Sequence, residues 1–243
     1  MYIIKLDAID STNTYLKEMC SVKLPKDYTV VSSETQTLGR GQMGTHWQAE
    51  PGKNLTVSVF KEVPGFNIEQ QFYVSMVVSL AICKALKVFN VPQLCIKWPN
   101  DILSAKQKIC GILIENIVKS NKLQGSVIGF GLNVNQKYFR DLPQASSMSL
   151  LTGVLFNKDE VLSEILKQLK IYFELIEFEK FKDIKSQYEN LLFRKDKAST
   201  FETKELSTFS GIIKGVTKKG KLKVWTEDEI VKTFNLKDVT LLY

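Results

Sequence analysis

Residues 36–44 read QTLGRGQMG, and Gly39, Gly41 and Gly44 within them match the G-x-G-x-x-G spacing of phosphate-binding loops. In a dinucleotide-binding fold a helix must begin at the third glycine, because the helix N-terminus binds the pyrophosphate. Here the chain continues THWQAEPGKNL, in which a Pro-Gly pair indicates a turn and no helical periodicity is present. Neither the V-A-I-K, H-R-D and D-F-G motifs of kinases nor a Walker loop occurs in the chain. We therefore interpret the match as coincidental and exclude these three folds.

Two interpretations of the loop remain. Its glycine amides and Arg40 can approach a phosphate closely, since glycine has no Cβ to block the approach. Alternatively, the segment is a surface loop whose glycines only form turns. His46, the single histidine, is interpreted as a loop residue rather than a catalytic acid, because no partner that would orient it is evident.

The composition is that of a soluble globular protein of one large domain with room for a small additional one. The chain has 243 residues, of which 44% are hydrophobic and 24% charged. No apolar run approaches the length of a membrane span, and the N-terminus lacks the features of a signal peptide. The four cysteines are scattered and form no C-x-x-C pair. We expect a cytoplasmic protein with free thiols, no membrane association and no zinc site.

The net charge of +7 raises the alternative of a nucleic-acid-binding module. The lysines are spread along the chain, with the densest group near the C-terminus, between 214 and 223. No helix-turn-helix pattern, zinc-finger spacing or RNP-like aromatic motif accompanies them. A solvated basic surface is the simpler interpretation, and salt-dependent binding to a labelled duplex would distinguish the two.

Hydrophobic periodicity predicts a main domain of mixed α and β structure followed by a small β domain. Helices are predicted from the DSTN segment onward, over 68–89 and from 157 to about 192, and strands over 28–36, 54–60, 94–98, 108–118 and 126–134. From about 207, or slightly earlier, short strands separated by tight turns indicate a barrel. The fold class is α+β (α/β), with a first domain over 1–195 and a second over 196–243.

Polar residues interrupt several of these strands at their ends. Lys97 and Asp101 flank a Pro-made turn just past an apolar strand, and Lys108 begins the next one. Gly111 leaves space against the backbone, and Asn133 interrupts an apolar run. Two alternatives without chemistry stay open. Lys108 can be a lysine that only protects a strand edge from aggregation, and the turn that contains Asp101 can be an ordinary acidic surface turn. Together these features favour a cleft lined by backbone.

Taken together, the segments strongly resemble the biotin protein ligase family. Six motifs occur in that family's order and approximate spacing: DSTN (10–13), QTLGRGQMG (36–44), WQAEPGKNL (47–55), KWPNDIL (97–103), KICGILIE (108–115) and GFGLNVN (129–135). The resemblance covers about residues 1 to 180. It implies a class II synthetase-like, biotin–lipoate ligase catalytic domain with a mixed sheet flanked by helices, and an SH3-like C-terminal barrel.

The resemblance implies an ATP-dependent ligase. Such enzymes make biotinyl-5′-AMP from biotin and MgATP and then transfer biotin to one lysine of a biotin carboxyl carrier domain of a carboxylase. A lipoate-type ligase or acyl transferase on the same scaffold is the alternative, although that branch lacks the G-R-G loop and the K-W-P-N-D pairing. Exchange of pyrophosphate into ATP that depends on biotin but not on lipoate separates the two. The resemblance leaves both a monomer and a homodimer open.

The resemblance also assigns roles to individual residues. Lys108 matches the lysine that bridges the biotin carboxylate and the α-phosphate, and Arg40 the arginine that closes over the ligand. Asp101 is an orienter or proton acceptor for the incoming acceptor lysine, and Lys97 completes the catalytic set. Contacts to biotin or its adenylate are expected from Ser11, Thr12, Asn13, Gln36, Gly39, Arg40, Gly41, Gln42, Trp47, Lys108, Gly111 and Asn133. The metal ligands stay unassigned.

One departure concerns the loop, which in the family often reads G-R-G-R-x-G-R. Gln42 and Thr45 stand at the second and third arginine positions, so this loop carries one cation where some relatives carry three. We expect the loop to be a mobile lid over biotinyl-AMP, ordered by ligand contacts through Arg40 and the backbone amides.

A second departure gives a testable expectation about DNA. Relatives that repress transcription carry an N-terminal helix-turn-helix, whereas here Met1 lies nine residues before DSTN. We expect no operator-specific binding with or without biotin. A footprint on a biotin-operon promoter at physiological salt would contradict this, once non-specific binding is excluded by its salt slope.

Overall fold

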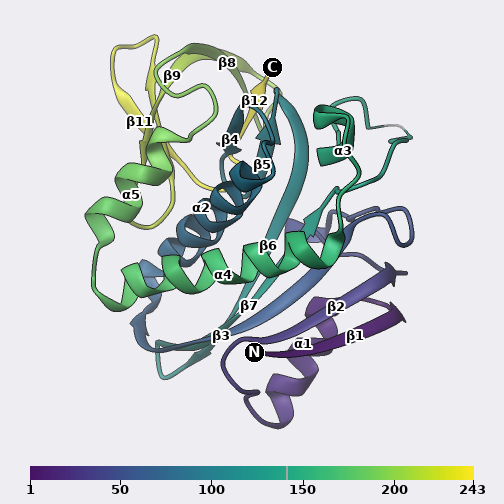
Figure 1. Cartoon of the computed structure of the whole chain (residues 1–243). Coiled ribbons are helices and arrows are strands. Elements are labelled where there is room, and N and C mark those ends of the chain that lie inside the picture. Colours follow the sequence, from purple (N-terminus) through teal and green to yellow (C-terminus); the bar gives the residue numbers. More distant parts are fainter. Residues whose placement is uncertain (141) are drawn as a thin grey trace.

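The computed structural model describes residues 1–140 and 142–243, and its largest element is a mixed sheet of seven strands (Figure 1). The strand order is β1-β2-β3-β7-β6-β5-β4. Only β1 and β2 are parallel, and every other neighbouring pair is antiparallel. The strands are β1 (Tyr2–Ile9), β2 (Thr29–Gln36), β3 (Leu55–Asn67), β4 (Leu94–Lys97), β5 (Asp101–Ser104), β6 (Gln107–Lys119) and β7 (Lys122–Leu132).

Helices cover both faces of this sheet because successive strand residues point to opposite sides. Val30 of β2 belongs to the large core formed with two helices, whereas its neighbour Val31 packs with Leu16 on the other face. The large core is made by α2 (Phe72–Val88) and α4 (Lys158–Glu177), and the smaller one by α1 (Thr12–Val22). Figure 1 shows α4 crossing one face and α1 lying behind β1 and β2. The short α3 (Met148–Thr152) and α5 (Phe181–Asn190) complete the helices.

The C-terminal residues form a separate antiparallel sheet of five strands, in the order β11-β10-β9-β8-β12. Its aromatic side chains pack on one another, with Phe201 and Phe234 both stacked on Phe209. Trp98, in the β4–β5 turn, donates its indole N–H to the carbonyl of Gly220 at 2.8 Å and so ties the two sheets together. The strands are β8 (Ala198–Thr203), β9 (Thr208–Val216), β10 (Leu222–Thr226), β11 (Val231–Phe234) and β12 (Val239–Leu242).

The α+β fold class with a second β sheet is confirmed, and the differences from the predicted elements are local. The strands β1 and β5 were not predicted, and the small sheet begins at Ala198 rather than near 207. The helical stretch after 157 is two helices, because the chain turns at Glu179, whose φ of 54° is left-handed and cannot continue a helix. The helix predicted over 68–89 begins with a 3-10 turn, Ile68–Gln70, before α2.

The expectation that no apolar segment approaches the length of a membrane span was wrong. Among the described residues, Ile68–Val88 is long and apolar enough to cross a membrane by length and composition, but 67% of an apolar 18-residue stretch within it is buried inside the protein. Twelve residues of α2 are buried, and they pack against α4, α5 and the sheet. Its hydrophobicity is therefore that of a central core helix.

Candidate active site

A cavity of about 390 Å³ lies where the main sheet meets the C-terminal sheet. Its walls come from the start of α1, the end of β2, the glycine loop, the β4–β5 turn, the middle of β6 and β7, and β12. Every residue predicted for the site lines this cavity except Gly39 and Asn133. Segments up to 230 residues apart in sequence therefore meet at one place.

The glycine loop is a small hairpin, which explains its three glycines. Gly41 donates its N–H to the carbonyl of Thr45 at 2.7 Å, and Trp47 donates to the carbonyl of Gly39 at 3.0 Å. A Cβ on Gly39 or Gly41 would overlap the facing residue, Trp47 or Thr45, and Gly44 has a left-handed φ of 83°. The next helical turn begins only at residue 68, beyond β3. The interpretation that this is no dinucleotide loop is confirmed, and Gly39 serves the hairpin rather than the cavity wall.

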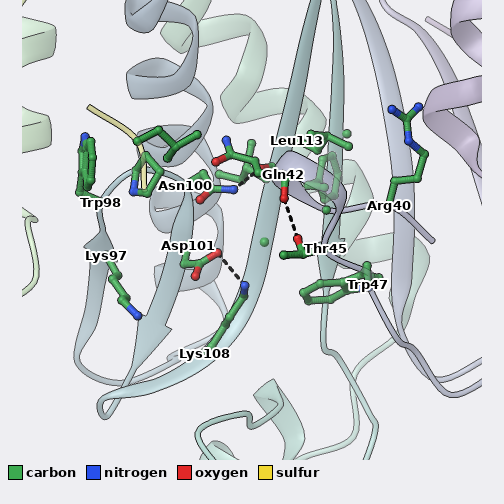
Figure 2. Close-up of a pocket in the computed structure, with 18 of the residues that line it drawn as sticks. Arg40, Gln42, Thr45, Trp47, Lys97, Trp98, Asn100, Asp101, Lys108 and Leu113 are labelled. Atoms are coloured by element: carbon green, nitrogen blue, oxygen red, sulfur yellow. Dashed lines mark hydrogen bonds and ion pairs between the residues drawn. The ribbon is translucent and has the colours of Figure 1, made fainter. Parts of the chain in front are cut away.

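Arg40 extends from this hairpin away from the Lys108 side of the cavity (Figure 2). Its guanidinium lies 3.3 Å from Glu115 Oε1 and 3.4 Å from Thr14 Oγ1. Lys17 reaches the same oxygen of Glu115 at 2.8 Å. Burial alone would raise the pKa of Glu115, but hydrogen bonds from Lys17 and Asn13 and the charge of Arg40 lower it overall. Arg40 is thus held by a charged carboxylate and must leave it to close over a ligand.

Lys108 and Asp101 form an ion pair at the opposite side of the cavity, with 2.7 Å between Nζ and Oδ1 (Figure 2). The strand register brings the two side chains to the same region. Asp101 is paired with Gly111 across β5 and β6, and the register of the two strands shifts between Gly111 and Lys108. Lys97 faces Asp101 across β4 and β5. The pKa of Lys97 is lowered, chiefly because burial disfavours its charge and also through Lys108, although Asp101 opposes the shift. Three of the four predicted catalytic residues therefore meet.

The turn between these strands is fixed by a side-chain amide. Asn100 donates Nδ2–H to the carbonyl of Ile112 at 2.6 Å, and its own carbonyl accepts the N–H of Ile112 at 3.0 Å. The Trp98–Pro99 peptide bond is cis. The two hydrogen bonds of Asn100 hold this turn against β6, and with it Lys97 and Asp101 at its two ends. The motif therefore has a structural role in addition to a chemical one.

The first residues of α1 form a closed hydrogen-bond network with β2 and β3. Ser11 caps the helix through Thr14 N–H, and Gln36 Oε1 accepts from the N–H and the hydroxyl of Thr12 at 2.8 and 3.0 Å. The buried hydroxyl of Ser58 lies 2.6 Å from Asn13 Oδ1. Ser11, Thr12, Asn13 and Gln36 line the cavity, and part of their hydrogen-bonding capacity is already used within this network.

Asn13 is the most constrained member of this network. Its Nδ2 donates to the carbonyl of Leu113 at 3.3 Å and to Glu115 Oε2 at 3.0 Å. A Cβ on Gly129 would overlap its side chain, so β7 must carry glycine there. Sequence reasoning missed Ser58 and Glu115. Glu115 closes the quoted motif KICGILIE, which was the available signal, whereas Ser58 lies in an ordinary alternating strand.

The indole of Trp47 fills the space above two glycines that face each other across β6 and β7. Gly111 and Gly131 are paired in register. A Cβ on Gly131 would overlap the indole, and one on Gly111 would lie 3.1 Å from Cζ3. The room expected over Gly111 is therefore occupied by Trp47 rather than open. The indole N–H is buried and has no acceptor among the residues that the structure describes, so this donor is available to a ligand oxygen.

Asn133 lies just outside the cavity. Its Nδ2 donates to the carbonyl of Ser146 at 2.9 Å, and its backbone N–H donates to Ile109 at 2.8 Å. Its Oδ1 is buried without a partner in the described part of the chain. A direct nucleotide contact by Asn133 stays a prediction, whereas its tie between the end of β7 and the Ser146 segment is evident.

Comparison with known proteins gives a consistent set of relatives. A family model described as "Biotin/lipoate A/B protein ligase family" matches residues 6–133. The "Bifunctional ligase/repressor BirA" of Bacillus spizizenii is 27% identical over 240 residues, which cover 96% of this chain and 72% of the relative. The "Biotin--[acetyl-CoA-carboxylase] ligase" of Mycobacterium tuberculosis is 29% identical over 163 residues, covering 66% of this chain and 59% of the relative.

Solved structures resemble the whole chain. The biotin protein ligase from Aquifex aeolicus in complex with biotin and ATP superimposes with a TM-score of 0.81 at 25% identity, covering 99% of this chain and 98% of that one. The match therefore includes the C-terminal sheet that forms part of the cavity wall.

Proposed function

The chain belongs to the biotin/lipoate A/B protein ligase family, and from this premise we propose that its cavity is the site where biotin reacts with ATP. The chain is a biotin–[acetyl-CoA-carboxylase] ligase, which activates biotin with ATP and transfers it to a carboxylase substrate. The observation that carries the site assignment is the convergence of Lys108, Asp101 and Lys97 in a cavity whose other wall carries the α1 hydrogen-bond network.

In the first half-reaction a carboxylate oxygen of biotin attacks the α-phosphorus of ATP, an O–P bond forms, and pyrophosphate leaves. Two anions must meet, so preorganised cations are the main requirement. Lys108 supplies one at the cavity wall and is oriented by Asp101. The α1 network of hydroxyl and amide groups suits the urea group of biotin, and the apolar floor of β6 and β7 suits its hydrocarbon part.

In the second half-reaction the amine of the acceptor lysine attacks the biotinyl carbonyl carbon, an amide forms, and AMP leaves. The amine must first lose a proton, because an ammonium has no free electron pair. Asp101 is the carboxylate of the cavity best placed to accept this proton or to orient the amine, since it faces the same space as Lys108. The acceptor is a lysine of a biotin carboxyl carrier domain.

Magnesium accompanies ATP in this proposal. The described residues contain no group of three or more histidine, cysteine, aspartate and glutamate side chains that could hold a metal. This fits Mg²⁺, which proteins often bind through one or two carboxylates together with substrate phosphates and water. Asp101 is the carboxylate of the cavity that could contribute, and the ion would offset phosphate charge.

We further propose a domain division, a cellular location and a test of the oligomeric state. The catalytic domain spans 1–195 and the SH3-like domain 196–243, supported by the start of the second sheet at Ala198. We also propose that the enzyme works in the cytoplasm. Whether it acts as a monomer or a homodimer would follow from its mass in solution.

The test of the activity is exchange of labelled pyrophosphate into ATP. We expect exchange that requires biotin and MgATP and is not supported by lipoate. Exchange supported equally by lipoate would favour the lipoate-type alternative on the same scaffold. Absence of exchange, together with salt-dependent duplex binding, would instead favour the nucleic-acid module.

A prediction about the loop concerns how long the adenylate stays bound. Gln42 is uncharged, so fewer cations hold the phosphate than in arginine-rich relatives, and we expect some adenylate to escape and label nearby lysines. Gln42→Arg should slow adenylate dissociation, because a well-formed charge-assisted hydrogen bond contributes about 1.5–3 kcal/mol at most. Dissociation rates are measured for both proteins, with Gln42→Met as the uncharged control of similar length. An unchanged or faster rate in Gln42→Arg would show that other contacts close the lid.

A further inference from the structure

Lys97 is a half-buried cation that lacks a carboxylate partner. Among residues 1–140 and 142–243, no aspartate or glutamate oxygen lies within 4.0 Å of its Nζ, and Asp101, which faces it across the strands, is bonded to Lys108 instead. This part of the cavity thus holds two lysines, Lys97 and Lys108, and one carboxylate, Asp101, which is paired with Lys108. An excess of positive charge remains, which suits a polyanionic ligand.

The group that contacts the Lys97 ammonium is the ring of Tyr243, whose centroid lies 4.6 Å from Nζ. Tyr243 follows β12 and is held on two sides. Phe193 packs edge-on against its ring at 4.9 Å between centroids, and Gln144 donates to its backbone oxygen at 3.2 Å. Burial, and next the charge of Asp101, raise the pKa of its phenol, so the ring is neutral at neutral pH.

A ring and a carboxylate would stabilise this lysine differently. A carboxylate at hydrogen-bond distance would neutralise the ammonium and compete with any phosphate that approaches it. An aromatic face attracts the cation through its quadrupole but does not neutralise its charge. Tyr243 therefore fixes the direction of Lys97 and leaves its positive charge available to a ligand.

We propose that Tyr243 is a positioning residue that holds Lys97 ready for the phosphates of ATP, so that the C-terminal sheet completes the nucleotide side of the site. The inference rests on the ligase function proposed above. Figure 2 shows Lys97 beside the Asp101–Lys108 pair. The neighbouring wall is built by Val239, Thr240 and Leu241 of β12, the strand that precedes Tyr243.

The test compares Tyr243→Leu with Tyr243→Phe in biotin-dependent pyrophosphate exchange. Loss of the ring should raise the KM for MgATP by roughly tenfold, the effect of losing a partly desolvated cation–π contact. The KM for biotin should stay within about twofold, since biotin is assigned to the other wall. Phenylalanine keeps the ring face and should behave like the parent protein. The matched control is Leu242→Ala, at the last residue of β12, which directly precedes Tyr243 and is slightly more exposed.

A double-mutant cycle then shows whether Tyr243 acts through Lys97. In a Lys97→Met background, Tyr243→Leu should add no further rise in the KM for MgATP. An equal rise in both backgrounds, or a folded Tyr243→Leu protein with an unchanged KM, overturns the inference; folding is checked by the thermal midpoint of each variant. If the parent protein itself shows no biotin-dependent exchange, the ligase assignment fails, which is a distinct result.

Discussion

Replacement of Lys108 by alanine lowers the rate of biotin-dependent pyrophosphate exchange by about 10²–10³ while the protein stays folded. The ammonium lies 2.7 Å from Asp101 and lines the cavity, with 37% of its side chain exposed, so it is fixed in direction yet accessible to substrate. Its charge opposes the negative charge that develops at the α-phosphate, and alanine removes this stabilisation from the transition state. The measurement is the exchange rate at saturating biotin and MgATP.

Two comparisons make this result specific. Lys106→Ala removes an exposed lysine from the adjoining turn and should leave exchange unchanged. Lys97→Ala should raise the KM for MgATP more than it lowers kcat, because Lys97 is assigned to phosphate binding. Near-normal exchange in Lys108→Ala would remove Lys108 from the chemistry and leave it a strand-edge lysine.

Replacement of Asp101 by asparagine lowers transfer of biotin from added biotinyl-AMP to the carrier lysine by about 10²–10⁴, the usual contribution of a positioned proton acceptor. Asparagine has nearly the same shape but cannot accept a proton at neutral pH. Adenylate formation should also fall, to a smaller extent, because Lys108 loses the carboxylate that orients it. The two half-reactions are therefore measured separately.

The control for Asp101→Asn is Asp7→Asn, which removes an exposed carboxylate of β1 that does not line the cavity. If transfer from biotinyl-AMP proceeds normally in Asp101→Asn while adenylate formation falls, Asp101 serves only to orient Lys108. The acceptor lysine must then lose its proton to water or to a group of the carrier.

The sequence motifs predicted the cavity well because their residues are fixed by local chemistry. The hydroxyl of Ser11 caps α1, and the W-P-N residues form the turn that holds Lys97 beside Asp101. Strand alternation placed the apolar residues of β3, β6 and β7 in the core. Such features depend on neighbours in sequence, so they can be inferred without knowledge of the tertiary structure.

The features that the sequence did not reveal depend on contacts between distant segments. The pairing of Gly111 with Gly131 creates the space that Trp47 fills, and it follows from strand register. The ion pair of Arg40 with Glu115 and the contact of Tyr243 with Lys97 join residues 75 and 146 positions apart. Strand β1 was missed because most of its residues are exposed, which leaves no clear alternation of buried and polar positions.

The conformation of the glycine loop connects these findings. Arg40 rests on Glu115 and Thr14, while the Lys108–Asp101 pair lies at the other side of the cavity. For Arg40 to contact a phosphate near Lys108, the ion pair with Glu115 must break and the hairpin that carries Trp47 must shift. Ligand contacts would have to offset that cost, which is why we expect loop residues to differ in hydrogen exchange between free and adenylate-bound protein.

The intact mass of a biotin carboxyl carrier domain after incubation with this protein, biotin and MgATP is the most direct test of the ligase function. We expect a gain of one biotinyl group on one lysine, which requires both biotin and ATP and disappears when that carrier lysine is replaced by arginine. An unchanged carrier mass under the complete conditions, or a gain of a lipoyl group when lipoate replaces biotin, would contradict it.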